Sequence, residues 1–240
     1  DCLLSRGLGD VYKRQVIIGV KKLKHTEALL KAEKFQQKME KIAQNDYWRP
    51  QYHIAAPANW INDPNGFCFY KGEYHLFYQY HPYSSQWGPM HWGHVASKDL
   101  ADWEHRPIAL APTDEYDKDG CFSGSAIEND GKLYLLYTGH VDLDNSNGGN
   151  DRIETQCLAV SDDGKHFEKV ENNPVIKALP ENLNIRTEHF RDPKVWKHGD
   201  WYYTVVGVQT KEESGQVVVY KSQDLINWEL SLIHISEPTR

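Results

Sequence analysis

The chain has 240 residues, 40% of them apolar and 25% charged, which is the composition of an ordinary globular protein with a sizeable core. Its formal net charge of −7 argues against nucleic acid or an anionic membrane as the main partner, because both favour a basic surface. The four cysteines lie far apart without a Cys-x-x-Cys spacing, which argues against a zinc site or a dense disulfide framework. The apolar run at 16–20 is too short for a signal or a membrane span, so we expect a cytoplasmic protein.

The two ends do not fit the patterns of their neighbours. Residues 1–15 (DCLLSRGLGDVYKRQ) and 231–240 (SLIHISEPTR) resemble translated adapter sequence left at the ends of assembled sequencing reads. Authentic flexible tails are the alternative. We predict non-native tails at both ends, an N-terminal segment at 16–48 and a β-rich catalytic domain at 49–230.

A single amphipathic helix is predicted from Thr26 to about Gln44. Apolar side chains recur there at spacings of three and four residues, with Lys and Glu between them, which is the period of one helical face. They are Ala28, Ala32, Phe35, Met39 and Ile42. We expect this helix to pack against the main domain and to take no part in chemistry.

After Trp48 the sequence changes to short β-forming runs separated by Gly, Asp, Asn and Pro, which is typical of an all-β domain. Two motifs alternate there, and each occurs three times at intervals of about 60–70 residues. The first is a glycine turn followed by an aromatic strand, at 71–78, 130–137 and 198–205. The second has the pattern Ser-x-Asp-x-x-x-Trp/Phe, at 97–103, 161–167 and 222–228.

This repetition predicts a β-propeller of which about three blades are present, because radial repetition of antiparallel sheets leaves only short, protected edges. A β-sandwich is the competing architecture. It would not explain why the Ser-x-Asp spacing recurs.

The most informative short motif is Trp-Ile-Asn-Asp-Pro-Asn-Gly at 60–66. On its own, Asp-Pro-Asn-Gly is a favourable β-turn sequence, with Pro at the second position and Gly at the fourth. Three further strings follow it: Gln-Trp-Gly at 86–88, Phe-Ser-Gly-Ser at 122–125 and Arg-Asp-Pro at 191–193. Each string is weak alone, so the information lies in their order.

These strings, with the run from His53 to His81, closely resemble the opening of family-32 glycoside hydrolases, which include invertases, sucrose-6-phosphate hydrolases and fructan hydrolases. The resemblance covers roughly residues 49–230. It implies a five-bladed propeller and an enzyme that cleaves terminal β-fructofuranosides with retention, through a fructosyl-enzyme intermediate. The expected partner is a small sugar: sucrose, sucrose 6-phosphate or a short fructan.

The resemblance also assigns the acidic site residues. A retaining glycosidase uses one carboxylate as nucleophile and a second carboxyl group, about 5–5.5 Å away, as acid and then base. Asp63 matches the nucleophile, and we expect donors of the surrounding turn to stabilise its charge. Asp192 matches the carboxylate that binds fructose hydroxyls and stabilises the transition state. Arg191 beside it is expected to offset the negative charge of the cluster.

Further residues match positions that line the fructose pocket of the family: Asn62, Gln79, Trp87, Phe122 and Ser123. The side-chain amides can bind sugar hydroxyls, and the aromatic rings can form walls. Structural roles are the alternative, since Gln79 could cap a strand and the two aromatic residues could belong to the core.

The family's acid/base catalyst, the Glu of a Glu-Cys pair downstream of Arg-Asp-Pro, has no counterpart here. The residues before the four cysteines are Asp1, Phe67, Gly120 and Gln156. Nothing marks Glu181, Glu188 or Glu213 as a substitute, so we expect surface roles for them. We expect the chain to end before the acid/base residue and to hydrolyse sucrose negligibly, because losing general acid catalysis costs roughly 10²–10⁴-fold.

Two patterns suggest a metal site and fail on inspection. Residues 142–147 begin like an EF-hand loop, but Asn147 stands at the required Gly position and Ile153 at the required Glu position. His81, His91 and His94 are close in sequence, but the residues between them match the sugar-pocket segment. No metal or other cofactor is implied, because the retaining mechanism needs carboxyl groups and water.

Three functions compete: a truncated glycosidase, a non-catalytic fructoside-binding propeller, and a purely structural propeller fragment. The presence of both Asp63 and Asp192 favours the first over the second. A related propeller glycosidase acting on other pentosides is disfavoured by the motif at 60–66. A phosphorylated substrate would need basic residues near the pocket, and the sequence leaves open whether His94, Lys118 or Arg152 lies there.

Overall fold

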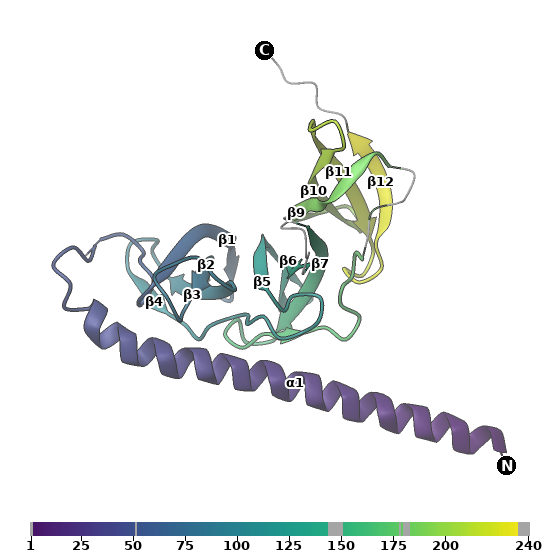
Figure 1. Cartoon of the computed structure of the whole chain (residues 1–240), viewed down its shortest axis with the longest axis horizontal. Coiled ribbons are helices and arrows are strands. Elements are labelled where there is room, and N and C mark those ends of the chain that lie inside the picture. Colours follow the sequence, from purple (N-terminus) through teal and green to yellow (C-terminus); the bar gives the residue numbers. More distant parts are fainter. Residues whose placement is uncertain (1, 51, 144–150, 178, 180–182, 235–240) are drawn as a thin grey trace.

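The structure is a computed structural model that describes residues 2–50, 52–143, 151–177, 179 and 183–234. Within these residues, one long helix precedes twelve strands in three four-stranded antiparallel sheets (Figure 1). The helix α1 spans Cys2–Ala43. Sheet 1 contains β1 (Trp60–Tyr70), β2 (Glu73–His81), β3 (His91–Ser97) and β4 (Trp103–His105). Sheet 2 contains β5 (Gly120–Asn129), β6 (Lys132–Asp142), β7 (Arg152–Ser161) and β8 (Glu168–Lys169). Sheet 3 contains β9 (Ile185–His198), β10 (Trp201–Thr210), β11 (Gly215–Ser222) and β12 (Glu229–His234).

Each sheet is a meander in which strands that follow one another in the chain are hydrogen-bonded neighbours. The first strand of each sheet faces the first strand of the next, since β1 contacts β5 and β5 contacts β9. The all-β body and the preceding helix are therefore confirmed. The interpretation of the sheets as propeller blades, and the number of blades, stays a prediction.

Both repeated motifs lie at equivalent places in the three sheets. The glycine motif forms the hairpin between the first and second strands. In sheet 1, Lys71 and Gly72 have φ of 47° and 83°, and in sheet 2, Asp130 and Gly131 have φ of 50° and 75°. Positive φ at both central residues is the geometry of a type I′ turn, which matches the twist of the flanking strands.

The Ser-x-Asp motif links the third strand of each sheet to the fourth. In sheet 3, the Ser222 hydroxyl donates to Asp224 Oδ1 at 3.0 Å and accepts the Leu225 amide at 3.0 Å, while the Trp228 indole donates to the Leu225 carbonyl at 2.9 Å. Sheet 1 repeats these contacts around Ser97 and Asp99. Sheet 2 repeats the serine and aspartate contacts, with Phe in place of Trp. The motif is thus a self-contained loop built from local side-chain–backbone bonds.

Apolar layers join successive sheets. Between sheets 1 and 2 lies a fully buried cluster that includes Phe77, Trp92, Leu135 and Tyr137. Between sheets 2 and 3 a second cluster includes Leu136, Leu158, Val195 and Tyr202. Neighbouring residues such as Leu135 and Leu136 point to opposite faces of β6, so sheet 2 is buried on both sides.

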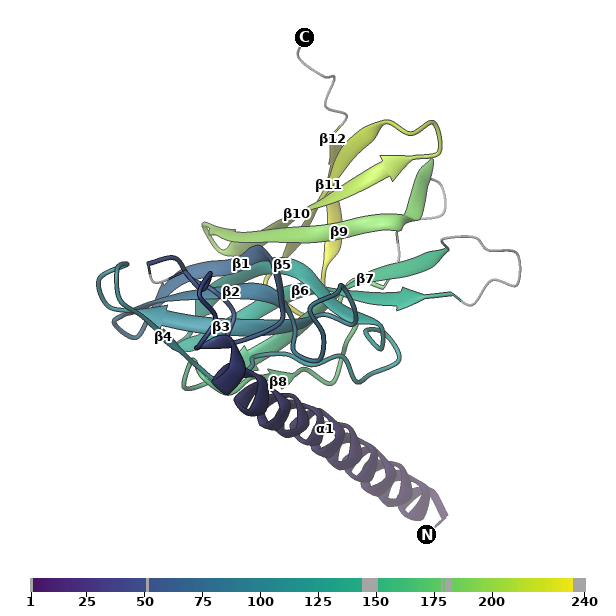
Figure 2. The same ribbon diagram turned by 60° about the vertical axis from the view of Figure 1, so that its left-hand side comes forward.

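The helix α1 runs beneath sheets 1 and 2, with sheet 3 on the far side from it (Figures 1 and 2). Ala32 is fully buried against the cluster of Tyr78, Tyr80 and Val95. The predicted amphipathic face is not confirmed, because Ile42 keeps 64% of its surface exposed. The helix also begins at Cys2 instead of Thr26, and no proline interrupts the chain between these two residues.

Secondary structure extends into both predicted tails, since α1 starts at Cys2 and β12 pairs with β11 as far as His234. Whether residues 1–15 and 231–240 are native stays a prediction. In the described part of the chain, no helix has an apolar stretch sufficient to span a membrane.

Candidate active site

Most of the predicted site residues lie at or beside irregularities in the first strand of each sheet, whereas Gln79 lies on β2 and Trp87 between β2 and β3. In β1, Ile61 pairs with Tyr80 and Pro64 with Tyr78, so Asn62 and Asp63 together stand opposite Gln79. In β5, Phe122 pairs with Thr138 and Gly124 with Tyr137, so Ser123 has no opposite residue on β6. In β9 the same kind of shift leaves Asp192 and Pro193 opposite Val206. Such β-bulges redirect side chains that a regular ladder would keep in register.

The segment at 60–66 is therefore not the β-turn that its sequence favours. The strand β1 continues through it from Trp60 to Tyr70, with one shift after Ile61 and a second after Asn65. Gly66 has φ of 54°, and a Cβ there would come within 2.8 Å of the Phe77 ring. The Pro and Gly residues that resemble a turn thus serve a bulged strand that packs closely on β2.

Two sheets meet at Asp63. The Ser123 hydroxyl, from β5, donates to Asp63 Oδ2, from β1, at 2.9 Å. Asp63 is exposed, so its remaining carboxylate lone pairs are open to a ligand. The expected donors of a local turn are replaced by a hydroxyl from the next sheet.

The backbone at Asp192 is held in the left-handed region, with φ of 63°. Its amide donates to Thr138 Oγ1 at 3.1 Å, and the Thr138 hydroxyl donates to Gln156 Oε1 at 3.1 Å. The Gln156 amide group donates in turn to the Phe190 carbonyl at 2.8 Å. This chain of buried polar side chains fixes an uncommon conformation, and such fixed departures cluster at functional sites.

Opposing effects act on the pKa of Asp192, and their sum raises it. Desolvation raises the pKa of Asp192 above its ordinary value, Arg191 lowers it, and the carboxyl groups of Glu154 and Asp63 raise it further. Arg191 Nε lies 3.7 Å from Asp192 Oδ2, while Arg191 Nη1 lies 3.3 Å from Glu154 Oε2. The Asp192 side chain keeps 58% of its surface exposed, yet desolvation and the neighbouring carboxyl groups outweigh the effect of Arg191 on its pKa. The balancing role expected of Arg191 stays a prediction.

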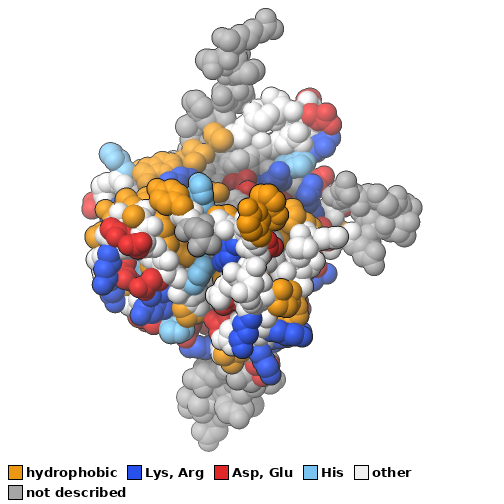
Figure 3. Space-filling model, turned by 90° about the vertical axis from the view of Figure 1, so that its left-hand side faces the viewer, with side chains coloured by type: hydrophobic (Ala, Val, Ile, Leu, Met, Phe, Trp, Pro, Cys, Tyr) orange, Lys and Arg blue, Asp and Glu red, His pale blue; other side chains and the backbone are white. Residues whose placement is uncertain are grey.

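Aromatic rings form one wall near these carboxyl groups. The Phe122 ring stacks on His140 with centroids 3.9 Å apart and planes 9° apart, and Trp87 meets Phe122 edge-on at 6.1 Å. Trp87 keeps 54% of its surface exposed, which excludes the alternative that it is a core residue. It is one of several exposed large hydrophobic side chains, and Figure 3 shows such side chains interspersed with charged ones on the side that lies at the left in Figure 1.

The two predicted amide residues differ. Asn62 is exposed, and its Oδ1 accepts the Trp60 indole at 2.7 Å. Gln79 is 2% exposed, and its amide donates to the Cys121 carbonyl at 3.0 Å, which ties β2 to β5. This contact favours the structural alternative for Gln79, and direct contact with a sugar stays a prediction.

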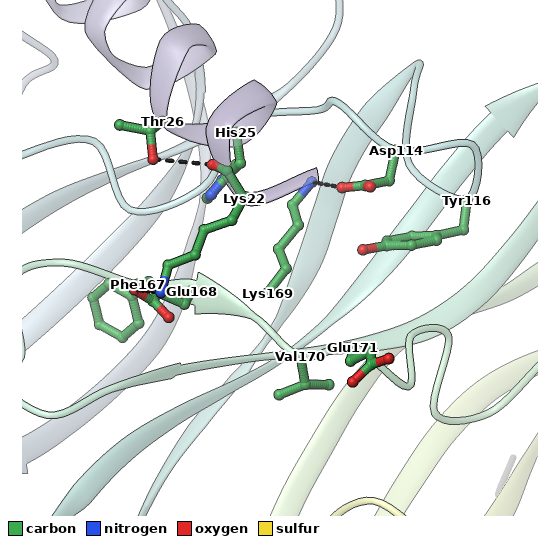
Figure 4. A pocket seen from close by; sticks show the side chains of 10 residues that line it. All are labelled: Lys22, His25, Thr26, Asp114, Tyr116, Phe167, Glu168, Lys169, Val170 and Glu171. Carbon is green, nitrogen blue, oxygen red and sulfur yellow. Dashed lines mark hydrogen bonds and ion pairs between the residues drawn. The ribbon is translucent and has the colours of Figure 1, made fainter. Parts of the chain in front are cut away.

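Two cavities differ in position. One of about 340 Å³ opens beside Asp192 and is lined by His189, Arg191, Gln209 and Gln216. Another, of about 150 Å³, lies between α1 and sheet 2 (Figure 4). There Lys169 Nζ lies 3.2 Å from Asp114 Oδ2 and 2.6 Å from Asp117 Oδ2, so the cations and anions satisfy one another. The second cavity marks where the helix packs and is separate from the predicted site residues.

The remaining candidates are dispersed. Glu181 lies outside the described residues. Glu213 is exposed at the β10–β11 turn and pairs with Arg186 at 3.4 Å, as expected of a surface residue. Glu188 is half-buried, and its carbonyl accepts Arg191 Nη1 at 3.4 Å.

The three histidines considered as metal ligands use their rings elsewhere. Nδ1 of His81 and of His91 each lies 3.1 Å from the Pro89 carbonyl, and His94 Nε2 lies 3.0 Å from His75 Nδ1. Among the described residues, no group of three or more His, Cys, Asp and Glu is arranged to hold a metal ion. Most of the EF-hand-like segment, 144–147, lies outside those residues.

Three basic residues are candidates for binding the phosphate group of a phosphorylated substrate. His94 is 1% exposed in the core, and Lys118 pairs with Asp119 at 3.8 Å beside α1. Arg152 is placed differently: it lies two residues before Glu154 on β7, and therefore on the same face of that strand. Of the three, Arg152 is the one near Arg191 and the Asp192 cavity.

Four residues that support the site escaped the sequence analysis: Thr138, His140, Glu154 and Gln156. All are at most 2% exposed. A signal was present, because Thr138 and His140 in β6, like Glu154 and Gln156 in β7, lie at spacing two and therefore on one face of their strand. A buried polar side chain at such a position needs a partner, and here the partners surround Asp192 and Phe122.

An all-β body that presents carboxyl groups beside an aromatic wall has the components of a carbohydrate site. Residues 53–238 match the family described as "Glycosyl hydrolases family 32 N-terminal domain". The match covers well over half of the chain, which therefore belongs to glycosyl hydrolase family 32.

Two of the similar curated proteins are named as hydrolases of sucrose 6-phosphate. "Sucrose-6-phosphate hydrolase" of Escherichia coli is 53% identical over 180 residues, which are 75% of this chain and 36% of the relative. The protein of the same name from Zymomonas mobilis subsp. mobilis is 48% identical over 205 residues, 83% of this chain and 39% of the relative.

Solved structures agree. A Bombyx mori GH32 beta-fructofuranosidase, as a mutant in complex with sucrose, has a TM-score of 0.75 and 46% identity, covering 85% of this chain and 41% of its own. A sucrose-6-phosphate hydrolase from Lactobacillus gasseri has a TM-score of 0.71 and 36% identity, covering 82% and 39%. The chain thus spans about two-fifths of the length of these relatives.

Proposed function

We propose that this chain forms the part of a retaining β-fructofuranosidase that supplies the nucleophile and the fructose-binding carboxylate. The observation that carries the proposal is the meeting of β-bulges at the first strands, where the Ser123 hydroxyl binds Asp63 at 2.9 Å and the charge of Asp63 acts on Asp192. We further propose that the three sheets are three blades of a propeller, because their first strands adjoin one another in chain order.

In this proposal, an Asp63 carboxylate oxygen attacks the anomeric carbon of the fructosyl unit while the glycosidic bond breaks. The hydroxyl of Ser123 fixes the other oxygen of that carboxylate and so orients the nucleophile. Asp192 accepts hydrogen bonds from fructose hydroxyls, and the wall of Trp87 and Phe122 packs against the sugar. The leaving oxygen takes its proton from an acid that follows Arg-Asp-Pro in the family, and the water that then releases fructose gives its proton to the same group.

For the substrate we propose sucrose or sucrose 6-phosphate. Relatives are named sucrose-6-phosphate hydrolase and raffinose invertase, and one related structure is a complex with sucrose. Arg152 supports the phosphorylated sugar, since its guanidinium charge acts at His189 beside the Asp192 cavity. Short fructans are a further option, because a fructan 1-exohydrolase of Cichorium intybus in complex with 1-kestose has 35% identity and a TM-score of 0.65.

A non-catalytic fructoside-binding protein is the second candidate. It is favoured by the predicted sugar-lining residues other than the carboxylates, because amide groups and aromatic rings can bind a sugar without catalysing a reaction. It is disfavoured by the exposure of Asp63, since a binding protein has no need for a carboxylate held by one hydroxyl and otherwise open.

A chimera tests the proposal: residues 53–230 replace the matching segment of the Escherichia coli relative. We expect it to hydrolyse sucrose or sucrose 6-phosphate with retention, monitored by NMR of the first fructose anomer released. Asp63→Asn should lower kcat by at least about 10³-fold, because the nucleophile is lost. Assays with both sugars decide between the two substrates.

The 240-residue chain serves as the matched comparison. We expect it to bind fructose weakly and to release no glucose from sucrose above the buffer rate. A folded chimera that binds fructose without turnover would favour the binding protein. Glucose release by the 240-residue chain that Asp63→Ala abolishes would show that no residue beyond this chain is needed.

A further inference from the structure

A buried carboxyl group behind the site has no role in the proposed reaction. Glu154 on β7 stands opposite His140 on β6 in the strand register, and the two residues are 2% and 1% exposed. Taking a carboxylate out of water is costly, and an apolar pair of similar volume is often as stable or more so. The presence of Glu154 there therefore calls for a reason other than packing.

Glu154 connects two parts of the site. Its Oε2 lies 3.3 Å from Arg191 Nη1, on the strand that carries Asp192. Its Oε1 lies 3.5 Å from His140 Nδ1, and within the described residues neither of these two atoms has a hydrogen-bond partner. His140 Nε2 lies 3.1 Å from Asp142 Oδ1, and the His140 ring supports Phe122.

The guanidinium of Arg191 has two carboxyl groups within reach. The Nη1 atom of Arg191 lies 3.3 Å from Glu154 Oε2 and 3.0 Å from His189 Nδ1. The Nε atom lies 3.7 Å from Asp192 Oδ2, which is beyond hydrogen-bond distance. A guanidinium pairs best with a carboxylate through two parallel bonds. Arg191 makes no such pair with Asp192 while Glu154 holds one end of it.

We propose that Glu154 is a positioning residue that holds Arg191 away from full pairing with Asp192 and holds His140 behind Phe122. Asp192 then keeps its lone pairs free for the sugar hydroxyls, and the aromatic wall keeps its place. This inference rests on the proposed role of Asp192 in binding fructose. Glu154 thus positions both Arg191, beside Asp192, and the aromatic wall at Phe122, without contacting the sugar itself.

The charged groups that face Asp192 come from three strands: Arg191 on β9, Glu154 on β7 and Asp63 on β1. Removing the charge of Glu154 takes away one effect that raises the pKa of Asp192. It also frees Arg191 to approach Asp192, which lowers that pKa further. Both changes have the same sign, so the direction is unambiguous.

The experiment compares Glu154→Gln with unaltered protein in the 240-residue chain, by NMR titration of the Asp192 carboxyl group, which Asp192→Asn identifies. We expect the pKa of Asp192 to fall and the affinity for fructose to weaken about tenfold, as for loss of one hydrogen bond to a charged group. The matched control is Glu168→Gln, an exposed glutamate on the adjacent strand β8, which should change neither. The shift should be smaller in an Arg191→Gln background, because part of it depends on the freed guanidinium.

An Asp192 pKa that stays unchanged or rises in Glu154→Gln would overturn the inference, even if that variant is less stable. If Glu154→Gln does not fold, Glu154→Asp replaces it, since the shorter side chain retains the charge but cannot reach Arg191 at the same distance. The titration is done without sugar. Failure of unaltered protein to bind fructose would therefore count against the proposed function, while the pKa of Asp192 would still decide the inference.

Discussion

The loops between third and fourth strands and the bulges of the first strands follow opposite rules. The Ser-x-Asp loops have nearly the same hydrogen bonds in all three sheets. The bulges differ: β1 presents Asp63, β5 presents Ser123 and β9 presents Asp192, each with its own register shift. The loops, whose sequence repeats in all three sheets, thus stabilise the fold. The bulges, whose residues differ from sheet to sheet, form the proposed site.

The reason lies in what each region must satisfy. A Ser-x-Asp loop closes its bonds within seven residues, so the same sequence gives the same structure wherever it occurs. A bulge depends on neighbours from other sheets, as when Ser123 reaches Asp63 across sixty residues of chain. The following experiments test whether the two regions can be separated.

Gly124→Ala should have the largest effect. A Cβ at Gly124 would come within 2.1 Å of the Leu136 carbonyl oxygen and 2.7 Å of Tyr137 Cα, both backbone atoms of β6. We expect a loss of about 3 kcal/mol in the free energy of unfolding, with loss of fructose binding, since β5 must move away from β6. Urea denaturation measures it. The matched control is Gly215→Ala, which meets no atom within 4 Å and should change stability by less than about 0.5 kcal/mol. Equal effects would mean that β5 does not approach β6 so closely.

Ser123→Ala and Ser125→Ala should have opposite consequences on the same strand. Ser123 binds Asp63, so its loss should weaken fructose binding about tenfold and leave the free energy of unfolding nearly unchanged. Ser125 is buried; it donates to the Pro193 carbonyl at 2.7 Å and accepts the Val195 amide at 2.9 Å. Its loss should cost about 2 kcal/mol of stability, because two buried backbone groups lose their partner. Calorimetric titration and urea denaturation separate the two effects, and a stability loss in Ser123→Ala would contradict the division.

The sequence predicted the repeated parts of the fold well. The glycine turns and Ser-x-Asp loops were visible as a repeat because their structure is local. The bulge at Asp63 could not be predicted in this way, because Asp-Pro-Asn-Gly favours a turn. Only the pairing of β1 with β2 shows that the strand is continuous there. Glu154 and His140 were missed for the same reason: their importance comes from Arg191 and Phe122, which lie far away in the chain.

The smallest expected effect concerns the repeated loop of sheet 3. Burial is the largest single effect on Asp224 and opposes its charge. The hydrogen bonds from the backbone and side chain of Asn227, the Ile226 amide and the Ser222 hydroxyl together outweigh it and lower the pKa of Asp224 to about 2. A lowered pKa contributes stability that is fully present above the unfolded value of about 3.9 and is lost as the pH falls through about 2. Asp224→Asn should therefore lower the free energy of unfolding at pH 6 by only roughly 0.5 kcal/mol, measured by urea denaturation, because Asn keeps one acceptor oxygen. The difference from unaltered protein should shrink as the pH falls from 4 toward 2, and fructose binding at pH 6 should be unchanged.

Asp200→Asn, an exposed aspartate at the β9–β10 turn, is the control and should show no such convergence. A weaker affinity for fructose in Asp224→Asn would mean that the repeated loops also support the site, and the separation between the two regions would fail.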